Sequence, residues 1–148
     1  MATRSLTRVI KRQEGLSFAE GHKHPNKACV NMYRHYDGYP EVHGIELAEF
    51  LRDFRVVNGL GSKDEAKIAN GYGCLAAFMV AHFKQDIAGQ IYLYECDDKD
   101  SWENYIYTVW PKEGEPTWIS IYDTSSEECI FVGTSEELIE KYAKTEGN

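Results

Sequence analysis

Residues 33–44, YRHYDGYPEVHG, gather most of the side chains suited to chemistry where a β-rich run meets a helical pattern. Arg34 offers a planar fork of N–H donors that matches a phosphate or a carboxylate. His35 and His43 add further donors, or a proton switch near neutral pH. These residue types together predict recognition of an anion.

Part of the same segment has the composition of a turn. The DGYP sequence is typical of a tight turn, in which Asp37 is expected to bind nearby backbone amides. Tyr36 and Tyr39 are expected at the edge of the core with hydrated hydroxyls, bordering a ligand site. A purely structural alternative stays open, in which Arg34 forms an ion pair with Asp37, with Glu41 or with an acidic residue of the later β-rich runs that form the predicted meander.

A second candidate group, Asn70, Gly71 and Gly73, comes directly before an apolar helical run. Glycines at the beginning of a helix expose N–H groups and the positive end of the helix dipole to a phosphate. The spacing fits neither a phosphate loop nor a dinucleotide fingerprint, and close packing explains such glycines equally well.

Charge is distributed unevenly along the chain. The formal net charge is −8, but residues 1–34 hold seven Lys or Arg and two Glu, which gives +5 there and −13 elsewhere. This pattern argues against a long nucleic-acid partner and favours a small anion, with Arg4 or Arg8 as further phosphate contacts. The alternative is a surface ribbon that carries solubilising charges.

Other kinds of site are not indicated. The four cysteines are widely separated and form no CxxC pair, and the histidines lack metal-ligand spacing, so we expect neither a metal nor a cofactor. Cys74 and His82 lie two turns apart on one predicted helix, too far to act as nucleophile and base.

The elements that position these residues predict an α+β fold of one domain, 1–148, with a mainly antiparallel sheet in the order ββ-α-α-ββββ-α. Residues 5–13 and 28–36 are β-rich, and residues 45–54 have the apolar spacing of an amphipathic helix. Four later β-rich runs predict an antiparallel meander. Thr134 and Glu137 have the capping-box spacing for a last helix.

The run from Cys74 to Phe83 is apolar almost all round, which predicts a central buried helix. Ala77→Asp is therefore expected to destabilise the protein by burying a charge. The many β-rich runs leave sheet edges to shield, which predicts a homo-oligomer, most simply a twofold dimer. No apolar run is long enough to span a bilayer, so we expect a cytoplasmic protein without a membrane partner.

Three segments, ATRS at the start, YRHYDGYPEVHG before ELAEFL, and NGYGCLAA before AHF, resemble a set of small proteins carried by bacteriophages and prophages. The resemblance covers roughly residues 1–110 and implies a phage-encoded protein of the host cytoplasm. The resemblance does not imply an activity. In size, acidity and polar chemistry the chain also resembles the phage sponges that sequester nucleotide signals of bacterial immunity.

Three functions follow as hypotheses. The first is a non-enzymatic binder of a cyclic oligonucleotide or an ADP-ribose-type signal, with Arg34 and Arg4 or Arg8 on phosphates, backbone donors from the Gly71–Gly73 turn, and Tyr or Trp rings on bases. The second is a phosphodiesterase-like hydrolase in which His35 and His43 exchange protons while Arg34 stabilises charge. The third is an inhibitor of a host protein that acts through an acidic surface. We expect binding rather than catalysis.

Overall fold

The computed structural model describes residues 2–59, 67–98 and 101–146. Its helices and strands confirm the α+β class with a mainly antiparallel sheet. In chain order the elements are β1 (Ser5–Ile10), the 3-10 turns η1 (Phe18–Lys23) and η2 (Pro25–Lys27), β2 (Ala28–Arg34), the π-helical turn η3 (Pro40–Gly44), α1 (Ile45–Leu51), β3 (Phe54–Val57), β4 (Lys67–Asn70), α2 (Gly71–Lys84), β5 (Ile91–Leu93), β6 (Tyr105–Trp110), β7 (Trp118–Asp123), β8 (Glu128–Thr134) and α3 (Ser135–Glu146).

The main sheet has six strands in the order β5-β2-β1-β6-β7-β8. The central strand β1 pairs antiparallel with β2 and parallel with β6, and the other neighbours are antiparallel. The predicted four-strand meander is wrong in one strand, because β5 pairs with β2 at the far edge and only β6, β7 and β8 form a meander. Alternation along a strand shows which residues share a face, but it does not show which strand lies next to it.

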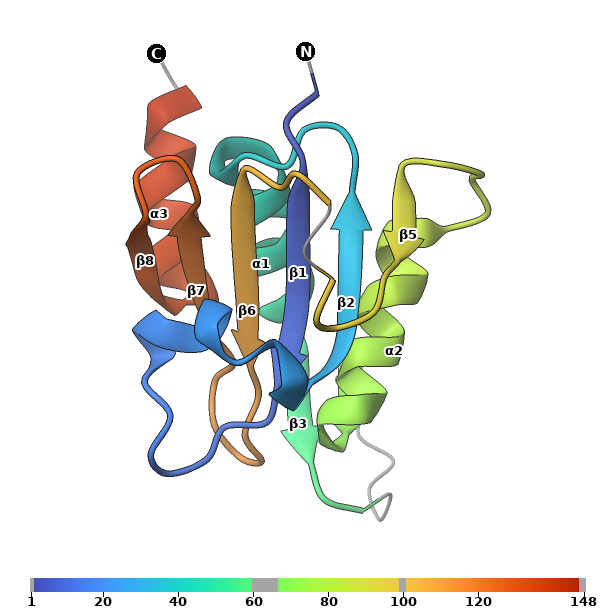
Figure 1. The fold of residues 1–148 in the computed structure, drawn as a ribbon. Helices are drawn as coiled ribbons and strands as arrows, with labels where there is room; N and C mark the ends of the chain where they lie inside the picture. Colours follow the sequence, from blue (N-terminus) through green and yellow to red (C-terminus); the bar gives the residue numbers. More distant parts are fainter. Residues whose placement is uncertain (1, 60–66, 99–100, 147–148) are drawn as a thin grey trace.

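All three α-helices lie on one face of the main sheet, which we call the helix face (Figure 1). The opposite face, called the η1 face, carries η1, η2 and the segment between β5 and β6. Phe18 of η1 packs there against Trp110 and Trp118. Side chains that alternate along β1 and β2 therefore enter two different environments.

Helix α2 is less buried than its composition predicts. Leu75, Ala76 and Met79 face the core, whereas Ala77 and Phe78 are exposed. The outer side of α2 stays accessible because the helix lies in the outer layer, on the sheet. The expectation that Ala77→Asp would bury a charge is therefore wrong.

A second sheet lies between α1 and α2, where the predicted order ββ-α-α-ββββ-α has no strand. Strands β3 and β4 pair in parallel, with Phe54 opposite Lys67 and Val57 opposite Asn70. Val56 and Ala69 are buried in the core. Four-residue strands beside glycine-rich sequence give too short a pattern to recognise.

Helix α3 begins as predicted. The Thr134 backbone N–H donates to Glu137 Oε1 at 2.9 Å, and the Glu137 N–H donates to Thr134 Oγ1 at 3.4 Å. This reciprocal pair confirms the capping box. Within the described part of the chain, no helix is both long and apolar enough to cross a membrane.

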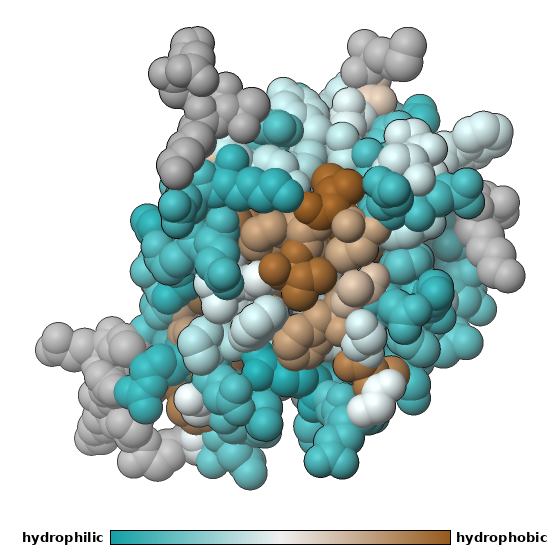
Figure 2. Space-filling view, turned by 90° about the vertical axis from the view of Figure 1, so that its left-hand side faces the viewer, coloured by the Kyte–Doolittle hydropathy of each residue, from teal (hydrophilic) through white to brown (hydrophobic). Residues whose placement is uncertain are grey.

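The β8 edge of the main sheet bears on the dimer prediction, which stays a prediction. Figure 2 faces the side of the molecule with β8 and α3, and shows apolar surface at its centre within a polar surround. The β8 edge is partly blocked, since Lys141 Nζ donates to the Ile130 carbonyl at 2.8 Å and the register shifts beside β7 at Ile121 and Tyr122. Both features oppose pairing with another strand.

Candidate functional site

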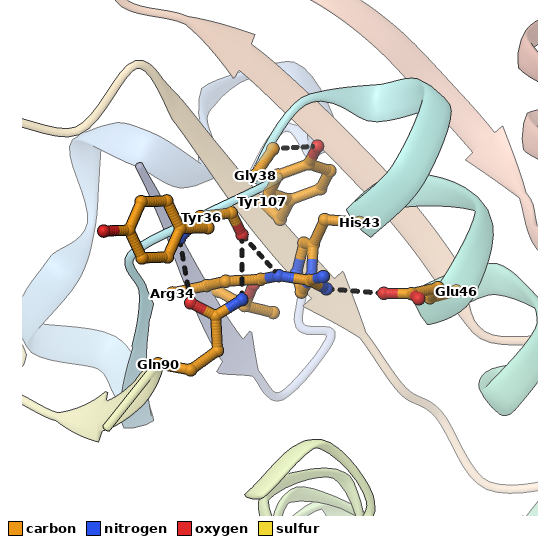
Figure 3. Close-up of polar contacts among 8 residues, drawn as sticks. Arg34, Tyr36, Gly38, His43, Glu46, Gln90 and Tyr107 are labelled. Atoms are coloured by element: carbon orange, nitrogen blue, oxygen red, sulfur yellow. Dashed lines mark hydrogen bonds and ion pairs between the residues drawn. The ribbon is translucent and has the colours of Figure 1, made fainter. Parts of the chain in front are cut away.

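Arg34, the last residue of β2, lies on the helix face and is only 8% exposed. Its Nε donates to the Tyr36 carbonyl at 2.8 Å, and its Nη1 donates to His43 Nδ1 at 3.1 Å and forms an ion pair with Glu46 (Figure 3). The structural alternative correctly expected an ion pair for Arg34 but was wrong about its partner, which is Glu46 of α1 and not Asp37, Glu41 or an acidic residue of the later strands. These three contacts hold the guanidinium in one orientation.

His43 is a neutral acceptor for Arg34 and not a proton switch. Its ring is fully buried, and burial together with the nearby Arg34 charge lowers the pKa of His43 to about 3. Because an arginine only donates, Nδ1 must accept, so Nε2 carries the proton and donates to Thr7 Oγ1 at 2.7 Å. The expectation of a protonated His43 that switches near neutral pH is therefore wrong.

The residues between Arg34 and His43 build the turn. Asp37 is exposed and has a φ of 61°, and the Gly38 carbonyl accepts from the buried Tyr107 hydroxyl at 2.7 Å. The Tyr39 carbonyl accepts from the N–H groups of Val42 and His43, which starts the π-helical turn. A side chain at Gly38 would come within 2.8 Å of Ser5 Cβ, so glycine is required there.

Tyr36 and Gln90 connect this turn to the strand edge. The Tyr36 N–H donates to Gln90 Oε1 at 3.0 Å, and Gln90 Nε2 donates back to the Tyr36 carbonyl at 3.2 Å (Figure 3). The Tyr36 carbonyl thus accepts from both Arg34 and Gln90, while the ring is exposed. Gln90 therefore helps to position the carbonyl that orients Arg34, although Gln90 is distant from Arg34 in the sequence.

Arg34 lines a groove on the helix face that has two compartments. The polar compartment has a volume of about 390 Å³ and is lined by Arg34, Glu46, Glu49, Phe50, Asp53, Lys67, His82, Phe83, Gln85, Gln90 and Ile91. The apolar compartment has a volume of about 420 Å³ and is lined by Phe50, Phe54, Lys67, Ile68, Phe78, Ala81 and His82. Both volumes lie in the range of small-molecule sites.

Three side chains border both compartments. Phe50 of α1 and His82 of α2 stack with ring centroids 4.6 Å apart, and Lys67 of β4 lies beside them. The polar compartment thus has two cations, Arg34 and Lys67. It also has three carboxylates, which belong to Glu46 and Glu49 of α1 and to Asp53 after the helix. A ligand here meets aromatic surface at one end and mixed charge at the other.

The remaining predicted site residues do not join this groove. Thr7 reaches His43 on the helix face, so Arg8, the next residue of β1, points to the η1 face. Arg4 interacts there with the Tyr33 hydroxyl. The predicted convergence of Arg34 with Arg4 or Arg8 on one ligand is therefore wrong, because the sheet separates them.

The glycine-rich candidate also lies elsewhere. Asn70, Gly71 and Gly73 line neither compartment: they are at the beginning of α2, whereas Arg34 meets His82 and Phe83 near its end, roughly 18 Å along the helix, and only Lys67 and Ile68 of the preceding strand border the groove. Asn70 Oδ1 accepts from the Gly59 N–H at 2.7 Å, which is a structural contact. These residues are therefore not part of the compartment that Arg34 lines.

His35 and His43 do not form an acid–base pair. His35 Nδ1 lies 2.7 Å from the Tyr33 hydroxyl and the ring packs edge-on against Tyr36, while His43 is buried beside Thr7. Among residues 2–59, 67–98 and 101–146, no three His, Cys, Asp or Glu side chains converge in a group that could hold a metal ion.

The sequence reasoning missed Glu46, Lys67, Gln85 and Gln90 as lining residues. One signal was available for Glu46, since it lies on the polar side of a helix that begins directly after the Arg34 segment. Comparisons of the chain with protein-family models, with curated proteins and with solved structures find no match. The resemblance to phage proteins stays a prediction.

Proposed function

We propose that the protein sequesters a small nucleotide signal in the two-compartment groove and does not transform it. One observation carries the proposal: a buried arginine, already oriented by three protein contacts, faces a hollow that continues into an aromatic compartment. A site that is oriented before binding loses less entropy when the ligand arrives. A nucleotide would place a phosphate at Arg34 in the polar compartment and a base on Phe50 and Phe78 in the apolar compartment.

The charges of the polar compartment narrow the ligand class. Glu46, Glu49 and Asp53 oppose a terminal phosphate, which carries nearly two negative charges at neutral pH. Each phosphodiester linkage of a cyclic oligonucleotide carries one charge, so Arg34 and Lys67 can neutralise one linkage while the others lie outside the polar compartment. Carboxylates also accept from ribose hydroxyls and from the amino groups of bases. The groove therefore favours a cyclic oligonucleotide over a ligand with free terminal phosphates.

The separation of His35 from His43 supports binding over the hydrolase alternative. A sponge fits the predicted phage origin, in which the protein would lower the concentration of an immune signal in the host. An inhibitor acting through the acidic surface would need no small ligand, so the test below distinguishes it.

The test is a calorimetric titration with cyclic dinucleotides, cyclic trinucleotides and ADP-ribose. We expect a cyclic oligonucleotide to bind, and Phe78→Glu to weaken it at least tenfold, because the new carboxylate occupies the base compartment. Val132→Glu is the matched control: Val132 is 38% exposed and Phe78 43%, but Val132 lies on the opposite edge strand β8. Equal affinity of both variants would refute the placement of the site, and binding of no nucleotide would refute the function.

A further inference from the structure

Two cysteines lie across from each other where the chain leaves the pair of strands β2 and β5. These strands are antiparallel, and their pairing continues past the end of β5, where the Tyr94 N–H donates to the Asn31 carbonyl at 3.0 Å. Two residues further along both segments, the same register places Cys96 opposite Cys29. Residues that are distant in the sequence thus bring two thiols to one place on the sheet edge.

A hydrogen bond shows how near the two residues are. Cys96 Sγ donates to the Ala28 carbonyl at 3.3 Å, and Ala28 directly precedes Cys29. Because a carbonyl oxygen lies about 3 Å from the next Cα of a trans peptide, Cys96 Sγ is no more than about 6 Å from Cys29 Cα. Opposite residues of an antiparallel pair and the two residues of a disulfide both have Cα atoms about 5.5 Å apart. The backbone spacing therefore suits a disulfide.

Both thiols are free, and reagents in solution can reach them. Cys29 is exposed and Cys96 is half-buried. Burial raises the pKa of both thiols, and the charge of Cys96 raises the pKa of Cys29 further, which agrees with their proximity. At Cys96, the positive charge of the buried Arg8 opposes the effect of burial and favours the thiolate. Cys96 therefore has the nearby cation that a reacting thiol needs.

We infer that Cys29 and Cys96 are an oxidation site, at which a peroxide converts the two thiols into a disulfide within one chain. The Cys96 thiolate attacks one oxygen of hydrogen peroxide, which breaks the O–O bond and gives a sulfenic acid and hydroxide. The Cys29 thiol then attacks the Cys96 sulfur, which breaks the S–O bond and gives the disulfide and water. In total, two thiols are oxidised and one peroxide is reduced to two water molecules.

The position of this bond gives it a consequence for the groove. Every residue that lines the two compartments lies between Cys29 and Cys96 in the chain. A disulfide would close this segment into a loop and so restrict the unfolded chain, which stabilises the folded state. Oxidation would therefore hold together the part of the protein that forms the groove.

The first experiment treats the reduced full chain, freed of reductant, with a small excess of hydrogen peroxide. Peptide mapping without reduction should then find a peptide from β2 linked to the peptide that follows β5, and two of the four free thiols should be lost. The melting temperature should rise by about 5–15 °C and return to its first value after reduction with dithiothreitol.

Variants assign the reaction to its residues. Cys29→Ser and Cys96→Ser should each abolish the linked peptides and the rise in melting temperature. Cys29→Ser should also leave a sulfenic acid on Cys96 that dimedone traps. Cys129→Ser is the matched control, because Cys129 is half-buried like Cys96 but lies opposite Tyr122 in β7, so this variant should react like wild type.

Arg8→Met tests the order of the two steps. Without the positive charge beside Cys96, the disulfide should form at least threefold more slowly, but the same two cysteines should be linked. An unchanged rate, together with a dimedone adduct on Cys29 in Cys96→Ser and none on Cys96 in Cys29→Ser, would contradict the attack by Cys96.

Two results would overturn the inference as a whole. One is a peroxide-treated wild type in which Cys29 and Cys96 are not linked, whether they stay free or are oxidised separately. The other is a link only between chains, seen as a covalent dimer that disappears on dilution before treatment, which would show that the exposed Cys29 reacts with a second molecule. Nucleotide binding is measured on the reduced protein, so either result leaves the proposed function standing.

Discussion

Arg34 and Arg8 lie on adjacent strands of one sheet, and both are almost fully buried, but they point to opposite faces. Arg34 reaches a carbonyl, an imidazole and a carboxylate, while Nε and Nη1 of Arg8 reach no hydrogen-bond partner. The first arginine is part of the framework and borders a groove, whereas the second is buried with two of its donor atoms unpartnered. Equal burial of one residue type thus leads to two different roles.

The largest expected effect that tests this contrast is the loss of Arg34. Arg34→Met should lower the free energy of unfolding by about 2–4 kcal/mol, because it leaves His43 Nδ1 and the Tyr36 carbonyl without this donor. Chemical denaturation measures the change. Arg52→Met is the control: Arg52 is exposed and its contact with Glu136 is 4.0 Å long, so its loss should cost less than about 0.5 kcal/mol. Equal midpoints for the two variants would contradict a framework role for Arg34.

The next effect is the response of the Arg34 region to acid. The unfolded chain protonates His43 below about pH 6.5, but the folded protein does so only below about pH 3. The unfolded state therefore binds more protons in that window, so stability is constant above pH 6.5 and falls as the pH decreases through it. His43 should account for about 2 kcal/mol of lost stability between pH 7.5 and pH 5.

Urea denaturation at the two pH values, compared between wild type and His43→Gln, measures the contribution of His43. The variant should be less stable at pH 7.5, but its stability should depend less on pH. An identical acid slope in both proteins would show that His43 is not held neutral in the folded state.

The smallest effect is expected at Arg8, with the opposite sign. Arg8→Met should leave stability unchanged or raise it by about 1 kcal/mol, because it removes a buried charge without a full set of partners. Thermal denaturation measures this. A loss as large as that of Arg34→Met would show that Arg8 has a structural role of its own.

Much of the fold was predictable because it depends on local patterns. The spacing of Leu47, Phe50 and Leu51 predicted α1 and its buried side, and Thr134 with Glu137 predicted the beginning of α3. The place of β5 beside β2 was not predictable, since pairing between distant strands leaves no local pattern. The exposure of Ala77 depends on what covers α2, which composition alone does not reveal.

The site was predictable only in part, for the same reason. Arg34 was identified by its chemistry, but its partner Glu46 comes from the next helix and its neighbour Lys67 from a strand that was not predicted. What the sequence did not show is that the sheet divides Arg34 from Arg8.

The central claim is that the groove binds a nucleotide signal and returns it unchanged. The most direct measurement is to incubate the protein with a mixture of cyclic oligonucleotides, remove unbound molecules, heat the protein and identify what is released by mass spectrometry. We predict release of one intact cyclic oligonucleotide in near-stoichiometric amount from wild type and Val132→Glu, and much less from Phe78→Glu. Release of a cleaved product, or of no nucleotide at all, would contradict the account.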